Sequence, residues 1–446
     1  MSAVTSPVAP ALPTWRDPAA WAKTADIVAV LIALSLPWST SLVGIFGAVF
    51  LVAVSPTLDF RAFLQSLKRP ICALPIALFT LALAGTLWSD APWGARTYAL
   101  SPATKLLVLP LLFYHFGRSA RGMWVFTAFL VSCTLLMLMS WLVMLYPGLS
   151  LKHDGAERGI FVKNYIDQSQ EFALCAVALA YPIVTLLRQR KIALAALLVA
   201  IALSFFVNMA FVIVSRTALV TVPVMFAVFA LLHLKWRSIA MIVGAAAVFA
   251  AIAWQASPQL RWTAETFVRD YQLYKERNLP TSIGVRLEFW QKSLRFFAEA
   301  PIIGHGTGST RGLFEQAAQG NINTATGQVI GNPHNQTLNV AVQWGIVGVA
   351  VLYAMWLLHL LLFRGEGLVN WIGLLVVVQN IFTSLFNSHI FDFHEGWMYV
   401  LGVGVAGGMA LKAKSGEEPG PGPVMITGMH AEDELSAGQH APRILP

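Results

Sequence analysis

The residues best suited to acid–base chemistry lie in the stretch GNPHNQTLNV, at 331–340. Asn332 is a good N-cap and Pro333 suits the first position of a helix, so His334 and Asn335 would lie in its first turn. The positive end of the helix dipole disfavours a protonated imidazole, and a neutral histidine is what a general base must be. A histidine that merely bonds to the capping turn would explain the pattern equally well.

Three arginines could bind an anionic ligand. Arg216 lies in VSRTALV (214–220), in a turn of only a few residues beside Ser215, and a guanidinium fork is well shaped for phosphate oxygens. Arg286 opens the stretch VRLEFWQKSLRFF and could be a second clamp, with Arg295 as a weaker candidate. Each also has a plain alternative, because Arg216 could extend to a membrane interface and the other two could face solvent.

Two further candidates are Lys105 and Asp392. Lys105 interrupts an apolar run, where an ionisable side chain suggests function unless it reaches the interface. Asp392 could orient a base or hold an arginine. It belongs with His389, His394 and Glu395 to a set with the composition of a metal site, but no helix or strand period puts three of them on one face. No Asp-x-Asp motif is found in an outer loop, so divalent-metal chemistry is disfavoured.

Composition determines the class of protein that must position these residues. Of the 446 residues, 57% are hydrophobic and only 12% are charged, well below the roughly 25% of soluble domains. The net charge of +8 lies in short clusters between apolar runs, which is typical of membrane orientation signals and not of nucleic-acid binding. Cys72, Cys133 and Cys175 all lie in apolar runs, so we expect buried thiols and no disulfide or zinc site.

The apolar runs predict an all-α membrane protein with about 12 transmembrane helices. The predicted segments are 24–39, 42–56, 71–88, 99–116, 123–146, 171–187, 192–214, 217–233, 238–255, 336–361, 367–387 and 396–412. The weakest are 99–116 and the pair 24–39 and 42–56. If one of these is re-entrant, the count falls to eleven or ten.

Lysine and arginine in the short loops set the orientation. With twelve spans, the basic loops all fall on one side, which must be the cytoplasm, and both ends of the chain lie there too. The loop cations are Arg61, Lys68, Arg69, Arg118, Arg121, Arg188, Arg190, Lys191, Lys235, Arg237, Arg364, Lys412 and Lys414. The segments 88–97, 147–170, 256–335 and 387–396 then face the opposite side.

The segment 256–335 is too long for a simple connector and is expected to be a helical outer loop between spans nine and ten. Two amphipathic helices are predicted, at 260–278 and 284–299, and a short third one within 310–319. Their apolar positions are Trp262, Phe267, Tyr271 and Tyr274 in the first helix and Leu287, Trp290, Leu294 and Phe297 in the second. These faces would pack on the membrane domain or on each other, and the loop could cover a cavity. Pro301 would end the second helix, before a flexible turn at 304–309.

The predicted organisation has five parts. They are a cytoplasmic lead at 1–23, nine spans within 24–255, the large periplasmic helical loop at 256–335, three spans within 336–412, and a disordered cytoplasmic tail at 413–446.

In combination these features resemble the O-antigen ligase family, part of the Wzy/ligase superfamily of bacterial envelope glycosyltransferases. The shared pattern is the topology with one large loop late in the chain, and a series of short motifs. These are SRT at 215–217, the arginine at 286, P-x-x-G-x-G at 301–306, HN at 334–335 and WGIVG at 344–348.

The resemblance implies a lipopolysaccharide-biosynthesis enzyme of the Gram-negative inner membrane, with its active site facing the periplasm. Such enzymes transfer a glycan from undecaprenyl pyrophosphate to a sugar of lipid A–core, by inverting transfer without metal or ATP. The essential histidine of the family matches His334, and its two functional arginines match Arg216 and Arg286. His334 would be the base, the arginines would bind the pyrophosphate, and Asn335 would be an orienting neighbour.

Other activities stay open. An O-antigen polymerase would use a lipid-linked glycan as acceptor; Arg295 and Gly306 have the R-x10-G spacing of polymerases, but only one large loop is present. A protein O-oligosaccharyltransferase would use a protein hydroxyl. A transporter or flippase is disfavoured. Such a protein would have inverted repeats and polar residues near the middle of the membrane, whereas the spans here are poor in charge and the polar residues gather at the outer surface.

Overall fold

The structure is a computed structural model that describes residues 17–151, 159–319 and 322–416. Every regular element in these ranges is a helix, which confirms the predicted all-α class for them. Most of the predicted lead and tail, 1–16 and 417–446, lies outside the described residues.

Nine helical segments of the described chain are long and apolar enough to cross a membrane. They are α1 (Pro18–Ser35), α2 with its 3-10 turn (Thr40–Val54 and Ser55–Thr57), α5–η2–α6 (Trp93–Leu100, Ser101–Leu107 and Val108–Phe116), α7 (Gly122–Leu145), α8–α9 (Tyr165–Ala178 and Ala180–Arg188), α10 (Ile192–Phe211), α11 (Arg216–His233), α12 (Trp236–Ala256) and α16 (Gln336–Leu362).

The predicted count of twelve spans is not confirmed, although each predicted segment overlaps a helix. The pair α3 (Phe60–Leu67) and α4 (Pro70–Ala84) would make a tenth span, but it is bent by 80°. Helix α17 (Leu368–Thr383) has only 16 residues. Helix α18 (Phe393–Lys414) is rich in glycine and has lysines in its last turn, which dilute its apolar character.

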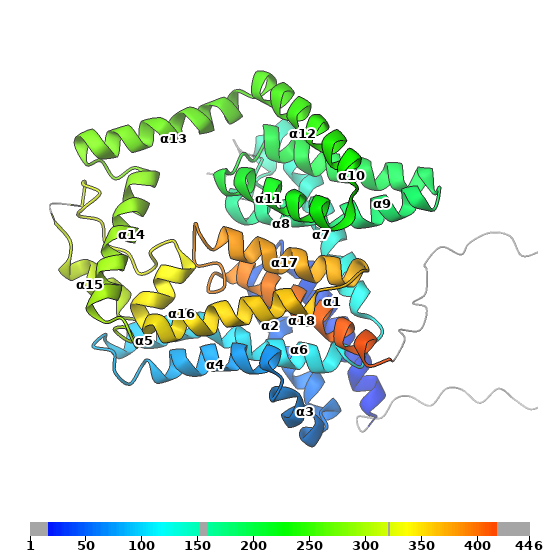
Figure 1. Cartoon of the computed structure of the whole chain (residues 1–446), viewed down its shortest axis with the longest axis horizontal. Coiled ribbons are helices and arrows are strands. Elements are labelled where there is room, and N and C mark those ends of the chain that lie inside the picture. Colours follow the sequence, from blue (N-terminus) through cyan, green and yellow to red (C-terminus); the bar gives the residue numbers. More distant parts are fainter. Residues whose placement is uncertain (1–16, 152–158, 320–321, 417–446) are drawn as a thin grey trace, which may run out of the picture.

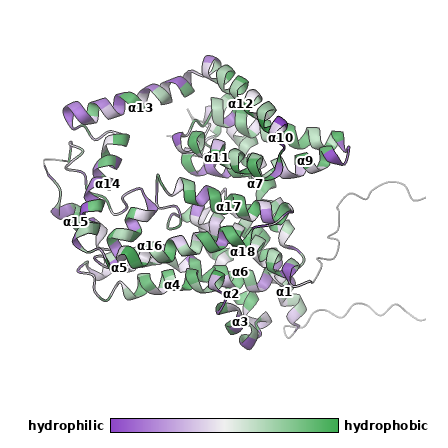
Figure 2. Cartoon of the chain, in the orientation of Figure 1, coloured by the Kyte–Doolittle hydropathy of each residue, from purple (hydrophilic) through white to green (hydrophobic). Residues whose placement is uncertain are grey.

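The spanning helices lie side by side, and the three remaining helices, α13 (Pro258–Arg277), α14 (Ser282–Glu299) and α15 (Thr310–Gln316), lie at one end of them (Figure 1). The start of α1 and the end of α18 lie at the other end. Figure 2 shows apolar residues over the bundle and mostly polar residues on α13. We call these two ends the loop end and the terminal end.

Close packing of small residues holds the bundle together. Helix α18 lies against α6, where a Cβ atom at Gly404 would meet Leu112 and one at Gly407 would meet Phe113. Glycines at such positions let two helix backbones approach closely in a membrane. The three cysteines are buried and free, as predicted.

Basic loops meet at the terminal end. Arg69, Arg118 and Lys412, which the sequence assigns to three different loops on one side, line one cleft of about 360 Å³. This arrangement fits the predicted grouping of the basic loops.

The three loop helices agree with the predicted ranges, but their buried faces differ from the prediction. On α13, Trp262, Phe267 and Tyr271 are about half exposed, and Thr263 and Thr266 are buried instead. An exposed aromatic stripe is stable at a membrane–water interface, so α13 does not need to bury it against protein.

On α14 the buried residues are Gly284, Glu288, Phe289, Ser293 and Phe296, and Leu294 is 57% exposed. Phe289 and Phe296 pack edge to face on Phe314 of α15, and Val342 of α16 completes this small core. The apolar face of α14 therefore includes residues neighbouring the predicted ones, and it fixes α14 against α16.

Helix α16 is broken at Gly345, where φ is 61° and ψ is −157°. The segment 301–306 supplies the backbone partners that the break leaves free. Ile346 donates its N–H to the carbonyl of Pro301 at 2.8 Å, and Gly306 donates to the carbonyl of Gln343 at 2.8 Å. The glycine motifs at 301–306 and 344–348 are separate in the sequence. In the structure they lie together, joined by these hydrogen bonds, and we call this contact the joint.

The neighbouring turn at 304–309 is held by hydrogen bonds to other helices, in contrast to the flexible turn predicted from the sequence. Thr307 donates its N–H to the carbonyl of Gly85 on the α4 side at 2.9 Å, and its hydroxyl accepts from the indole of Trp344 at 2.8 Å. This turn therefore joins the loop end of α4 to α16.

Replacing Gly345 with alanine should destabilise the fold. Its backbone angles are almost exclusive to glycine, and a Cβ atom would meet the carbonyl of Ile302. The cost should be about 1–3 kcal/mol, measured as a lower midpoint of thermal unfolding in detergent. The control is Gly44→Ala, in the interior of α2 with no atom within 4 Å of the added methyl group. Equal midpoints for the two variants would refute the role of the joint.

Candidate functional site

His334 lies just before α16 and not inside it. The N-cap is Asn335, whose side-chain oxygen accepts from the N–H of Leu338 at 3.1 Å, and the helix begins at Gln336. The predicted cap at Asn332 is therefore wrong. Asn332 instead accepts the N–H of His334 at 3.0 Å, while His334 has a left-handed backbone with φ of 52°. His334 is therefore outside the helix, and Asn335 has a structural role as the N-cap.

The imidazole of His334 has one bonded and one free nitrogen. Nδ1 lies 2.9 Å from Oδ1 of Asn387, and Nε2 has no hydrogen-bond partner within the described residues. An amide oxygen can only accept, so Nδ1 carries the proton and Nε2 has a free lone pair in the neutral ring. The ring is thus arranged to accept a proton at Nε2.

Asn387 is oriented by its other bonds. Its amide nitrogen donates to Oδ2 of Asp392 at 2.5 Å, and its oxygen accepts from Asn332 at 3.3 Å. With the amide nitrogen donating to Asp392, the amide oxygen faces His334. Asn387 was missed in the sequence, since a single asparagine in a loop between spans carries no signal.

Arg286, which is on α14, lies close to His334. Phe289, one helical turn further on, has its ring centroid 6.2 Å from that of the imidazole. The Arg286 guanidinium is partly buried and makes no hydrogen bond or ion pair with any described residue. A guanidinium without a partner in a partly buried position is available to a ligand.

Arg216 and Arg286 line the same cleft, which has a volume of about 170 Å³ and is formed by α8, α11, α13 and α14. Arg216 is the first residue of α11, after the N-cap Ser215. Its two terminal nitrogens lie 3.3 Å from Oδ2 of Asp270, and one donates to the hydroxyl of Thr266 at 2.9 Å. Asp270, also missed in the sequence, holds Arg216 in position at the cleft.

Electrostatics keep His334 neutral. Burial lowers its pKa below the usual 6.5 and the positive charge of Arg286 lowers it further, while the bond to Asn387 opposes both. Burial likewise lowers the pKa of Arg286, with a contribution from Arg216. Arg286 therefore interacts electrostatically with both His334 and Arg216 and lies between them in this arrangement.

Asp392 is linked to His334 through Asn387, and Lys105 binds the backbone of Asp392. Burial raises the pKa of Asp392 to about 7, which Lys105 partly opposes and Asp167 reinforces. Lys105 is buried, and its ammonium donates to the backbone carbonyl of Asp392 at 2.5 Å. It does not extend to an interface; it fixes the loop that carries Asn387 and Asp392.

The structure corrects one prediction about metal ligands. His389, Asp392 and Glu395 bring one donor atom each to within 4.8 Å of the others, although no regular period predicted three of this set on one face. The loop from His389 bends into the first turn of α18, so the spacing follows neither a helix nor a strand. His394 does not belong to this group of three, and its Nδ1 lies 2.7 Å from Oδ2 of Asp167 on α8.

Arg295 lies away from this site. It is nine residues beyond Arg286, which is half a turn around the helix at 100° per residue. Its side chain is 66% exposed and pairs with Glu299 at 2.9 Å. The structure therefore brings together His334, Arg216, Arg286 and Asp392, and leaves Arg295 on the opposite face.

The family comparison bears on the region that contains most of the cleft and His334. Residues 201–353 match the model of a family described as O-antigen ligase, which confirms the predicted resemblance. This range contains Arg216, Arg286 and His334 but not Asn387 or Asp392. No curated protein matches the chain.

Replacing Arg286 with glutamine should raise the pKa of His334. The change removes a positive charge that disfavours the imidazolium, so protonation becomes easier and the titration moves to higher pH. The measurement is a titration of the labelled His334 ring by NMR in detergent micelles. Arg295→Gln is the matched control, on the same helix but the opposite face, and an equal shift in both variants would contradict the proximity of Arg286.

Proposed function

Because residues 201–353 match the model of the O-antigen ligase family, we propose that this chain transfers a glycan from undecaprenyl pyrophosphate to a sugar of lipid A–core. The observation that supports this proposal best is the shared cleft of Arg216 and Arg286, beside a histidine whose Nε2 is free. A donor diphosphate needs cations, and an acceptor hydroxyl needs a base.

The proposed reaction is a single displacement with inversion. The acceptor oxygen attacks the anomeric carbon of the donor sugar, and the bond from that carbon to the phosphate oxygen breaks. Nε2 of His334 takes the hydroxyl proton, and undecaprenyl pyrophosphate leaves with the bonding electron pair. The developing negative charge is then stabilised by Arg216 and Arg286, so the cleft stabilises the transition state more than the ground state.

Asn387 and Asp392 would act through His334. Asn387 fixes the tautomer with a proton on Nδ1, and the Asp392 carboxylate fixes Asn387. After proton transfer the imidazolium would donate to Asn387 from Nδ1 and carry a charge that Asp392 can stabilise across the amide. Both are positioning residues in this scheme, and Lys105 supports their loop.

The proposed place of the reaction is the periplasmic face of a Gram-negative inner membrane. The loop end carries the site, and the basic loops meet at the terminal end. Positive loops remain in the cytoplasm, so the loop end would face outward. Lipid-linked glycan and lipid A–core would both reach it from the outer leaflet.

The deciding experiment is reconstitution of the full chain in liposomes with an undecaprenyl-pyrophosphate glycan and purified lipid A–core. Wild type should form ligated lipopolysaccharide, and His334→Ala should lose about 10²–10⁴-fold of the rate because the general base is gone. Unligated donor should accumulate in cells that carry only this variant.

Parallel reactions identify the acceptor. Polymer growth on lipid-linked glycan alone would favour a polymerase, and transfer to a protein hydroxyl would favour a protein O-oligosaccharyltransferase. Full activity of His334→Ala towards lipid A–core would remove His334 from the mechanism.

Transfer should persist in EDTA. The proposed leaving-group charge is stabilised by two guanidinium groups, and the Lys105 ammonium already lies beside the Asp392 and Glu395 carboxylates. The rate should therefore change less than about twofold, well inside a 1 kcal/mol effect on the barrier. Complete loss in EDTA with recovery on adding a divalent cation would assign a metal to His389, Asp392 and Glu395 and overturn the arginine mechanism.

A further inference from the structure

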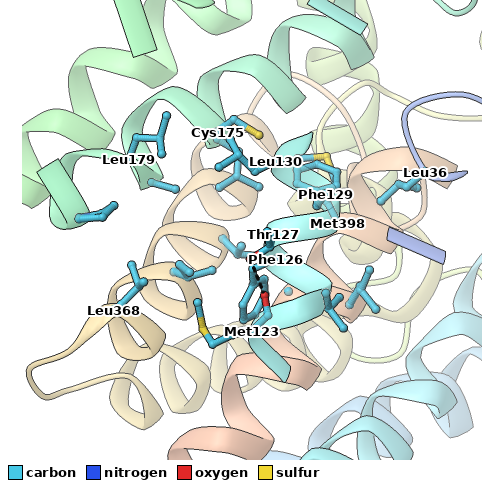
Figure 3. A pocket seen from close by; sticks show the side chains of 18 of the residues that line it. Leu36, Met123, Phe126, Thr127, Phe129, Leu130, Cys175, Leu179, Leu368 and Met398 are labelled. Carbon is cyan, nitrogen blue, oxygen red and sulfur yellow. Dashed lines mark hydrogen bonds between the residues drawn. The ribbon is translucent and has the colours of Figure 1, made fainter. Parts of the chain in front are cut away.

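A second cavity lies between helices of the bundle, away from the arginine cleft. Its volume is about 250 Å³, and its walls come mainly from α7, α8, α9, α17 and α18 (Figure 3). In Figure 3 the side chains of Met123, Phe126, Leu179 and Leu368 surround it. Neither the family match nor the proposed chemistry assigns it a role.

The cavity is elongated along the bundle. Its wall on α17 runs from Leu368 to Val376 and its wall on α7 runs from Met123 to Leu130, which is about 11–12 Å at 1.5 Å per residue. Leu368 begins α17 at the terminal end, so the cavity reaches into the half of the bundle far from the loop helices.

The lining is suited to hydrocarbon and not to water or a polar ligand. The side chains are aliphatic, aromatic or sulfur-containing except Thr127, and the Thr127 hydroxyl already donates to the carbonyl of Met123 at 3.0 Å. A cavity without free donors or acceptors does not hold ordered water. Within a membrane, the available occupant of such a space is a lipid chain.

Helix α8 and its continuation connect the two cavities. Ile166 lines the arginine cleft, and Leu174 and Ala178 line the apolar cavity eight and twelve residues further along. Eight residues of helix span about 12 Å. A ligand with a charged head at Arg216 and Arg286 would therefore have a hydrocarbon-lined space below its head, on the same helix.

We propose that this cavity binds the isoprenoid chain of the donor lipid, an inference that rests on the proposed function. An extended undecaprenyl chain is longer than the ~30 Å hydrocarbon core of a bilayer, so its distal part must reach the far half of the membrane or fold back. The acyl chain of an outer-leaflet phospholipid reaches only the near end of the cavity, because one leaflet provides about half of that thickness. Binding the chain there would hold the diphosphate in register with His334.

The test compares donors of different chain length in the reconstituted full chain. Ala178→Phe fills the cavity and should raise the KM for an undecaprenyl donor about tenfold, the value of one to two buried methylene groups. The KM for the same glycan on geranyl pyrophosphate should stay unchanged, because that two-unit chain is shorter than the ~12 Å between the cleft and the cavity. Ala246→Phe, an equal change on the exposed face of α12, is the matched control.

A second cavity-filling variant and a photolabelling experiment provide independent tests. Thr127→Trp fills the cavity from α7, where the side chain is exposed, and replaces Ala178→Phe if that variant fails to fold. An undecaprenyl pyrophosphate with a diazirine at its distal end should label peptides 123–130 or 368–376 of wild type, and not α12.

The outcomes separate this inference from the proposed function. Equal KM values for both donors in the filled variants, or labelling by an acyl diazirine phospholipid that undecaprenyl pyrophosphate does not displace, would overturn the chain site. Distal labelling of 123–130 or 368–376 without transfer of any glycan would support the chain site and overturn the proposed reaction.

Discussion

The geometry of the site depends on the broken backbone of α16 at Gly345. A helix interrupted inside a membrane bundle leaves N–H and carbonyl groups without partners, and each is costly where water is scarce. The segment 301–306 satisfies them, so the end of α14 is bonded to the middle of α16. Since Arg286 lies on α14 and His334 precedes α16, this joint helps to set the position of Arg286 relative to His334.

The sequence predicts the helices well because apolar runs and amphipathic periods extend over many residues, as α13 and α14 illustrate. It fails where the outcome depends on one residue. Asn332 and Asn335 are both good caps beside Pro333, and only the packing of the 384–392 loop, where Ser384 accepts the N–H of Gln336, selects the second. The same limit explains why Asn387 was missed in the sequence and why the exposure of Trp262 on α13 was not predicted.

Arg216, Arg286 and His334 were identified from residue type and local context, and the structure places the two arginines in one cleft and His334 near Arg286. What could not be predicted is which groups hold them. Asp270 pairs with Arg216 across 54 residues of sequence, and Asn387 binds His334 across 53. Such contacts depend on how distant helices pack, and periodicity within one helix carries no information about them. Lys105 was likewise recognised as unusual, but its partners lie at the start of α18.

The ion pair between Arg216 and Asp270 also sets a condition on what can enter the cleft. An incoming anion must take the guanidinium from a carboxylate that is already in place, at 18% exposure, and must tolerate that carboxylate as a neighbour. A ligand with a single negative charge exchanges one contact for an equivalent one and gains little. On the proposed function, a diphosphate with two charges can engage Arg216 and Arg286 together, so this ion pair would favour lipid carriers with a diphosphate head group over those with a single phosphate.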